Sequence, residues 1–259
     1  MMIYYIWLFL LTIKCFFSLT FMSFFDIIMM VKDMQERLEW LLKDNLDVVK
    51  SKVILIIGLG GVGSYALETL ARTYFKKIII VDGDKIDISN LNRQLMSNVN
   101  NIGCYKTDVW QERILKINPS CEVIKITEFI NKENLYKLFQ SEVDYVIDAC
   151  DTVETKKEII KYCLKNKIKF ISVMGMANRI DASYVKFSYL DKTCYDPLAK
   201  KLRLLLKKDN IKSKIPVIYS EEIPIKNRNL GSIAHVPAIA GILCTNYIIN
   251  DILKGVIHE

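Results

Sequence analysis

Short apolar runs alternate with helix-like segments along the middle of this 259-residue chain. Each run is rich in Ile and Val, which is typical of strands buried on both faces. The expected strands are Val53–Ile57, Lys77–Asp84, Cys121–Phe129, Asp144–Asp151 and Lys169–Gly175, and the expected helices between them are Ser64–Arg72, Cys104–Ile117, Lys132–Phe139 and Glu154–Asn166. This alternation predicts the α/β class, with a doubly wound, Rossmann-like and mostly parallel sheet.

The pattern changes after Asp181. Tyr184–Leu190 alternates apolar and polar residues like an exposed strand, and Ile215–Lys226 is a second extended run. A basic amphipathic helix is expected between them at Asp196–Asp209. These segments predict an antiparallel extension in the C-terminal part. The apolar stretch Ile233–Leu253 includes a proline and several polar residues, so we expect a helix packed on the sheet rather than a membrane span.

The first 29 residues form a hydrophobic N-terminal extension. They are long enough to cross a bilayer, but Lys14 interrupts them and no cleavage site follows. Two interpretations stay open. Residues 1–29 are a membrane anchor, or they precede the true start, which is then Met29, Met30 or Met34. In both cases the folded domain is expected at residues 30–259, beginning with one or two amphipathic helices within Val31–Lys52.

A glycine-rich stretch follows the first expected strand and opens the next helix. Gly58, Gly60, Gly61 and Gly63 form the pattern G-x-G-G-x-G. Glycines let phosphates approach the backbone, and a helix N-terminus offers free N–H groups. Asp82, at the end of the next strand, stands where a carboxylate accepts hydrogen bonds from a ribose. The stretch predicts a bound nucleotide, but leaves open whether it is NAD(P) or FAD for redox chemistry, or ATP.

Polar residues further along the chain favour ATP. Asn90, Arg93 and Lys106 follow the second expected strand, and cations there can neutralise charge that develops at phosphorus. An NAD enzyme needs no such cluster. Asp151 ends the fourth expected strand, on the ligand-binding side of a parallel sheet. Because carboxylate and phosphate oxygens suit Mg²⁺, these four residues together indicate an activation site for ATP and magnesium.

These motifs also resemble one family. The series G-x-G-G-x-G-S, D-x-D, S-N-L-N-R-Q, a lysine thirteen residues after Arg93, and D-x-x-D-T resembles the ThiF/MoeB/ubiquitin-activating superfamily, which adenylates carboxylates with Mg-ATP. The resemblance runs from about Met34 to the C-terminus. The segment "MGMANRIDASYVKFSYLDKTCYDPLAKKLRLLLKK", with Asp-Lys-Thr and Asp-Pro-Leu-Ala-Lys-Lys-Leu-Arg, is similar to the subgroup of tRNA threonylcarbamoyladenosine dehydratases.

The resemblance implies a role for each candidate residue. The ATP-binding residues would be Gly58, Gly60, Gly61, Gly63, Asp82, Asn90, Arg93 and Lys106. Asp151 would hold Mg²⁺, and the catalytic residues would be Arg93, Lys106 and Arg37. Arg37 would reach the site from the partner subunit, which implies a homodimer. Lys43 stands where the family usually has a glycine after that arginine, which leaves the turn there open.

The implied reaction is ATP-dependent dehydration of threonylcarbamoyladenosine in tRNA to its cyclic form. The enzyme would be an adenylate-forming ligase that adenylates the threonyl carboxylate before the ring closes. Two alternatives stay open. One is adenylation of the C-terminus of a ubiquitin-like sulfur carrier, with Cys194 or Cys163 as acceptor thiol. The other is a nucleotide-binding scaffold without turnover. A dehydrogenase is disfavoured.

Charge and cysteine content fit a cytoplasmic, RNA-directed protein. The net charge is +7, and residues 1–29 contribute none of it because Lys14 and Asp26 cancel. A basic surface favours polyanions such as RNA, although a lysine-rich solvated surface gives the same count. Lys200–Lys208 and Lys212–Lys214 are candidate contacts to the tRNA backbone. The seven cysteines form no C-x-x-C pair, so we expect reduced thiols and no structural zinc.

Overall fold

The computed structural model describes residues 35–257, and the membrane question for residues 1–29 falls outside that range. The chain divides into two compact units, Met1–Lys43 and Asp44–Glu259. In the first unit, residues 35–42 are helical. The second unit holds the sheet and every candidate residue except Arg37.

Seven strands form one sheet in the order β3-β2-β1-β4-β5-β7-β6. Their bounds are β1 Val53–Ile57, β2 Lys77–Val81, β3 Glu122–Ile126, β4 Tyr145–Asp148, β5 Lys169–Val173, β6 Val185–Tyr189 and β7 Pro216–Ser220. All neighbours pair in parallel except β6 and β7, which are antiparallel. The predicted α/β class, the doubly wound parallel sheet and the antiparallel C-terminal extension are therefore confirmed.

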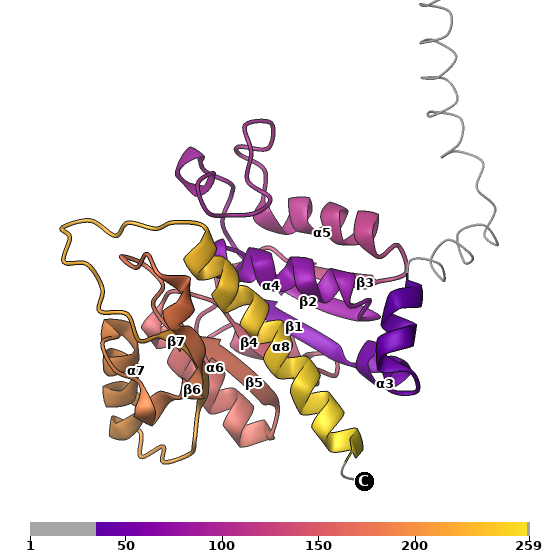
Figure 1. Ribbon diagram of the computed structural model, residues 1–259. Helices are drawn as coiled ribbons and strands as arrows, with labels where there is room; N and C mark the ends of the chain where they lie inside the picture. The colour runs from indigo at the N-terminus through magenta and orange to yellow at the C-terminus, as the bar shows by residue number, and fades with distance from the viewer. Residues whose placement is uncertain (1–34, 258–259) are drawn as a thin grey trace, which may run out of the picture. The chain divides into compact units, whose positions relative to one another are not determined.

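Helices cover both faces of this sheet (Figure 1). Their bounds are α3 Asn45–Ser51, α4 Gly61–Arg72, α5 Lys106–Ile117, α6 Val153–Asn166, α7 Pro197–Lys208 and α8 His235–Ile257. Helix α4 packs against α5 and α8, whereas α6 packs against α7. Four short 3₁₀ helices join these elements: η1 Ile88–Asn90, η2 Leu135–Phe139, η3 Ala182–Tyr184 and η4 Leu190–Lys192.

The core explains why the strands appear as continuous apolar runs. Leu55 on β1 and Val146 on β4 belong to a buried cluster that includes Ile160 of α6 and Leu202 of α7. Ile54 of β1 is equally buried, so both faces of the central strands are covered. Each such side chain contributes roughly 1.5–3 kcal/mol by leaving water.

Helix α8 is the apolar segment for which the sequence raised a membrane span. Among residues 35–257, His235–Lys254 is the one helix with the length and mean hydropathy to cross a bilayer, and half of it is buried. A Cβ at Gly241 would collide with the carbonyl oxygen of Val62 in α4, so glycine allows the close crossing. The hydroxyls of Thr69 and Thr245 lie 2.7 Å apart across the same contact. The helix packs within the fold, as predicted.

One predicted helix is wrong. Lys132–Phe139 holds only the short 3₁₀ helix η2. Asn131 Oδ1 accepts the backbone N–H of Glu133 at 2.9 Å, and Asn134 Oδ1 accepts that of Asn131 at 2.8 Å. Such side-chain bonds compete with the helical ladder and favour turns.

Candidate active site

The glycine loop is shaped by two positions that exclude a side chain. Gly58 leaves β1 with φ +91°, a conformation that favours glycine, and a Cβ there would lie 2.7 Å from the carbonyl oxygen of Ala149. A Cβ at Gly63 would collide with the carbonyl oxygen of Gly58. The loop therefore lies directly against the end of β4 and leads into the N-terminus of α4, where free N–H groups favour phosphate.

Gly60 gives a matched contrast. Its backbone is extended, at φ −73° and ψ −151°, and a Cβ there would meet only the Gln94 side chain, at 3.7 Å. We expect Gly58→Ala to lower the free energy of unfolding by about 2 kcal/mol or more, because strain and collision add. Gly60→Ala should change it by less than about 0.5 kcal/mol. Equilibrium urea unfolding measures both, and equal losses would contradict this description of the loop.

Asp82 and Asp84 both follow β2, but Asp82 is bonded to the backbone and Asp84 is exposed. Asp82 accepts the backbone N–H of Leu59 at 2.7 Å and that of Asp84 at 2.8 Å. Its side chain is 8% exposed, whereas that of Asp84 is 52% exposed. Asp82 thus ties the glycine loop to β2. The accessible carboxylate at this edge belongs to Asp84, which the D-x-D pattern contains but does not distinguish.

Lys106 begins α5 and points at both of these carboxylates. Its Nζ lies 2.7 Å from Asp84 Oδ2 and 3.6 Å from Asp82 Oδ2. The side chain is buried, in the same packed region as Leu59 and Gln94. An isolated antiparallel β-bridge pairs the backbones of Lys85 and Tyr105 and holds the chain extended just before the helix. Helix α5 therefore starts at Lys106 and not at the predicted Cys104.

Arg93 lies beside the N-terminus of α4. Its Cγ is 3.5 Å from the Cβ that Gly61 lacks, and its Nη1 donates to the carbonyl oxygen of Ser89 at 2.8 Å. Among residues 35–257 no carboxylate pairs with this guanidinium, so its charge is available to an anion. Asn90 fixes the segment before Arg93: its Oδ1 accepts the backbone N–H of Asp87 at 3.1 Å, which completes the capping box of η1.

Asp151 is exposed just beyond β4, two residues after the Ala149 that contacts the glycine loop. The N-cap of α6 is Thr152, so Asp151 does not serve there, and its Oδ1 meets only the Thr152 hydroxyl at 3.3 Å. No group of three ligating side chains occurs in the part of the chain that the structure describes. A single carboxylate that shares a cation with phosphates and water fits Mg²⁺.

A buried ion pair lies under this edge, and sequence patterns did not reveal it. Lys156 Nζ lies 3.1 Å from Asp148 Oδ1, and both side chains are inaccessible to solvent. Asp148 Oδ2 also accepts the hydroxyl of Ser172 at 2.6 Å. Burial alone would lower the pKa of Lys156, but the Asp148 carboxylate raises it above its usual value. The pair fixes the end of β4.

Two thiols in this region, Cys150 and Cys163, have raised pKa values. Cys163 is fully buried, and burial raises its pKa to about 12. Cys150 donates to Asp148 Oδ1 at 3.0 Å, and burial raises its pKa well above the usual value. The hypothesis of Cys163 as an acceptor thiol is therefore wrong. A carrier protein cannot reach the buried sulfur, and the raised pKa disfavours the thiolate form. Cys194 is half-buried.

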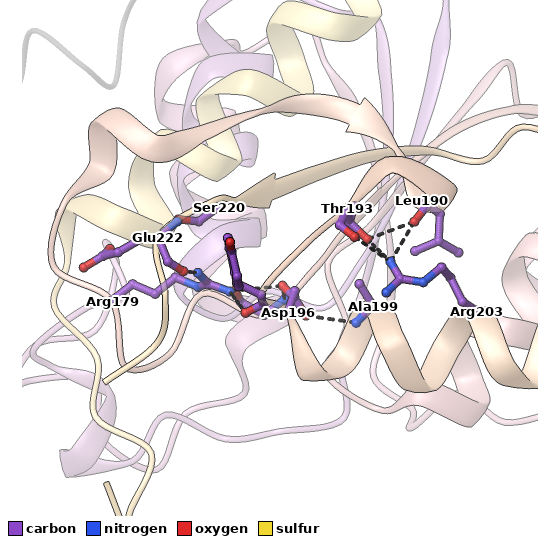
Figure 2. Close-up of polar contacts among 10 residues, drawn as sticks. Arg179, Leu190, Thr193, Asp196, Ala199, Arg203, Ser220 and Glu222 are labelled. Carbon is purple, nitrogen blue, oxygen red and sulfur yellow. Dashed lines mark hydrogen bonds and ion pairs between the residues drawn. The ribbon is translucent and has the colours of Figure 1, made fainter. Parts of the chain in front are cut away.

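The Asp-Lys-Thr and Asp-Pro-Leu-Ala motifs take part in two hydrogen-bonded clusters, one around Thr193 and Arg203 and one around Asp196 and Arg179, together called the α7 network (Figure 2). Asp196 caps α7 by accepting the N–H of Ala199 at 2.9 Å, and it accepts the N–H of Gly175 at 3.0 Å. Arg179 is buried and lies 3.4 Å from Asp196. Arg203 donates to the Leu190 carbonyl oxygen at 3.0 Å. The network ties α7 to the same sheet edge as the nucleotide site.

Arg37 falls in the first unit, within helical residues 35–42. Lys43 follows with φ +48°, and its N–H donates to the Glu39 carbonyl oxygen at 2.8 Å. Lysine thus adopts the left-handed turn for which the family uses glycine. The role of Arg37 stays a prediction. In the second unit, the structure brings together the glycine loop, Asp82, Arg93, Lys106 and the end of β4.

Comparison with known proteins adds to this geometry. The sequence profile of the ThiF family matches residues 33–256. The chain belongs to the ThiF family. A relative named tRNA threonylcarbamoyladenosine dehydratase, from Bacillus subtilis, is 38% identical over an alignment of 233 residues that covers 83% of this chain and 92% of the relative. The predicted family is therefore confirmed.

A solved structure of this ThiF-family subgroup agrees. The Escherichia coli tRNA N6-threonylcarbamoyladenosine dehydratase in complex with ATP superposes with a TM-score of 0.84 at 32% identity, over 88% of this chain and 97% of that one. A second structure of the same protein contains AMP. The match covers almost the whole domain, and it supports both the expected α/β fold and the expected ATP-dependent enzyme of the ThiF family.

Proposed function

We propose that this protein dehydrates threonylcarbamoyladenosine in tRNA to its cyclic form and consumes ATP. The observation that carries the proposal is the match of nearly the whole domain to a dehydratase whose solved structure contains ATP. The site supports it: the glycine loop lies beside an arginine without a carboxylate partner among the described residues. The place of action is the cytoplasm, where tRNA resides.

The chemistry follows from the charges at this edge. The threonyl carboxylate attacks the α-phosphorus, the bond to pyrophosphate breaks, and Arg93 and Lys106 stabilise the added negative charge. Backbone N–H groups of the loop and the N-terminus of α4 hold the phosphates. Mg²⁺, when bound through Asp151, supplies further charge neutralisation. Arg37 of the partner subunit adds a cation, so the active form is a homodimer.

Ring closure needs no covalent thiol. The carbamoyl group of the modification attacks the activated carboxyl carbon, AMP leaves, and one proton is lost. The water removed from the nucleoside is consumed in the net conversion of ATP to AMP and pyrophosphate. Both reacting groups belong to one nucleoside, so the step gains from high effective molarity. The raised pKa values of Cys150 and Cys163 agree with a mechanism without thiolate chemistry.

Release of AMP distinguishes this function from its alternatives. With Mg-ATP, the protein should produce AMP in proportion to threonylcarbamoyladenosine-modified tRNA and none with the same tRNA unmodified. AMP formation that depends instead on the C-terminus of a ubiquitin-like carrier would support the sulfur-carrier alternative. ATP binding without AMP under either condition would support a scaffold.

N-terminal sequencing of the native protein decides whether residues 1–29, proposed as an anchor, are translated.

A further inference from the structure

A surface cavity of about 620 Å³ lies away from the nucleotide site, between η2, the C-terminal half of α6 and the segment after α7. We call it the α6–α7 cavity. Its charged and aromatic lining consists of Lys132, Tyr136, Glu158, Lys161, Tyr162, Lys165 and Lys212. The proposed mechanism uses none of these residues.

The cavity carries net positive charge. Glu158 is its one acidic lining residue, and Lys161 is neutralised by Asp209 at 2.7 Å. The other three lysines, Lys132, Lys165 and Lys212, are exposed. Within residues 35–257 none of these three has a carboxylate within ion-pair distance. Three uncompensated ammonium groups around one cavity favour a polyanion.

Aromatic rings give the cavity a second feature. Tyr136 is 60% exposed, and Tyr162 is half-buried and stacked on Phe139 with 4.1 Å between ring centroids. An exposed ring and a ring of fixed orientation line the same cavity, and each offers a face on which a nucleobase can stack. Lysines for phosphates and tyrosines for bases are together typical of single-stranded RNA binding, in which unstacked bases are inserted against aromatic side chains.

The position relative to the reaction site also fits RNA. Helix α6 begins at Val153, two residues after Asp151, and its cavity-lining residues, Glu158 to Lys165, lie about 8–18 Å further along the helix. Helix α7 follows it: Lys201 lies 3.3 Å from Glu154 near the start of α6, and Asp209 contacts Lys161 near its end. Exposed lysines on α7, including Lys207 and Lys208, continue the positive charge along this face.

We propose that the α6–α7 cavity is a second tRNA-binding site, which holds backbone phosphates and one unstacked base away from the nucleotide site. This inference rests on the proposed function, because tRNA is the polyanion that the reaction requires. A large RNA held at two such points is oriented before its modified base enters the nucleotide site.

The test is steady-state kinetics with modified tRNA. The triple variant Lys132→Ala/Lys165→Ala/Lys212→Ala should raise KM for tRNA at least tenfold and change kcat less than twofold. Its KM should also depend less on salt, with a log–log slope smaller by about two, because three phosphate contacts are lost. Tyr136→Ala should raise KM at least about fivefold, since base stacking contributes roughly 1–3 kcal/mol. The Kd for ATP should not change.

A control triple removes equal charge from elements that do not line the cavity, α5, β3 and α8: Lys116→Ala/Lys125→Ala/Lys254→Ala. It should leave KM within twofold of the parent protein. If the cavity triple and the control triple behave alike while the parent dehydrates tRNA, the second site is refuted and the proposed function stands. If the parent protein itself does not turn over modified tRNA, the proposed function fails and the cavity proposal with it.

Discussion

Arg93→Ala should lower kcat for AMP formation by about 10²- to 10³-fold, the cost of removing one group that stabilises charge in a transition state. The guanidinium lies beside the N-terminus of α4 and has no carboxylate partner among the described residues. Because Arg93 is half-buried, lies outside the hydrophobic core and forms no ion pair among the described residues, the fold should survive the change. Single-turnover release of AMP with modified tRNA measures the effect.

The control is Arg72→Ala, which removes an exposed arginine from the last turn of α4, at the end far from Arg93. Arg72 is engaged with Glu68 at 2.7 Å, and the change should leave kcat within twofold. An Arg93 variant with full activity would contradict the assignment of the phosphate site. Retention of ATP affinity together with loss of turnover would place the arginine at the transition state rather than in ground-state binding.

Lys156→Met should lower the free energy of unfolding by about 3–5 kcal/mol, because it leaves the Asp148 carboxylate buried and unpaired. Both side chains are inaccessible to solvent, so water cannot replace the lost partner. Measurement at neutral pH is appropriate. The pKa of Lys156 is raised in the folded state, so its stabilisation is complete below the unfolded-state pKa and is lost only in alkaline solution.

The double variant Asp148→Asn/Lys156→Met separates charge from packing. The neutral amide can still meet the Ser172 hydroxyl, so at least half of the lost stability should return in guanidinium unfolding. A single variant that loses less than about 1 kcal/mol, or a double variant no more stable than the single, would show that the ion pair does not hold this edge.

Patterns in the sequence predicted the parts of the site that are local. The glycine spacing and the acid after β2 follow from strand–loop–helix geometry, which a short segment defines by itself. The strand ends were predicted less well. Asp82 and Asp151 fall beyond β2 and β4 rather than within them, and this places both at the carboxyl edge where they are needed.

Features that join distant segments could not be predicted in this way. The contact of Lys156 with Asp148 and Ser172 depends on β4 and β5 being neighbours and on the face that α6 covers. Asp82 was predicted to bind ribose, yet its bonds to Leu59 and Asp84 appear only once the loop is folded. The α6–α7 cavity combines three segments, each of which resembles an ordinary solvated surface.

The most direct test of the central claim is the mass of the modified nucleoside. tRNA that carries threonylcarbamoyladenosine is incubated with the protein, ATP and Mg²⁺, and its nucleosides are released and weighed by mass spectrometry. Dehydration predicts a nucleoside lighter by one water, formed only with ATP and absent with Arg93→Ala. An unchanged mass, in a reaction where the protein still converts ATP to AMP, would contradict the claim.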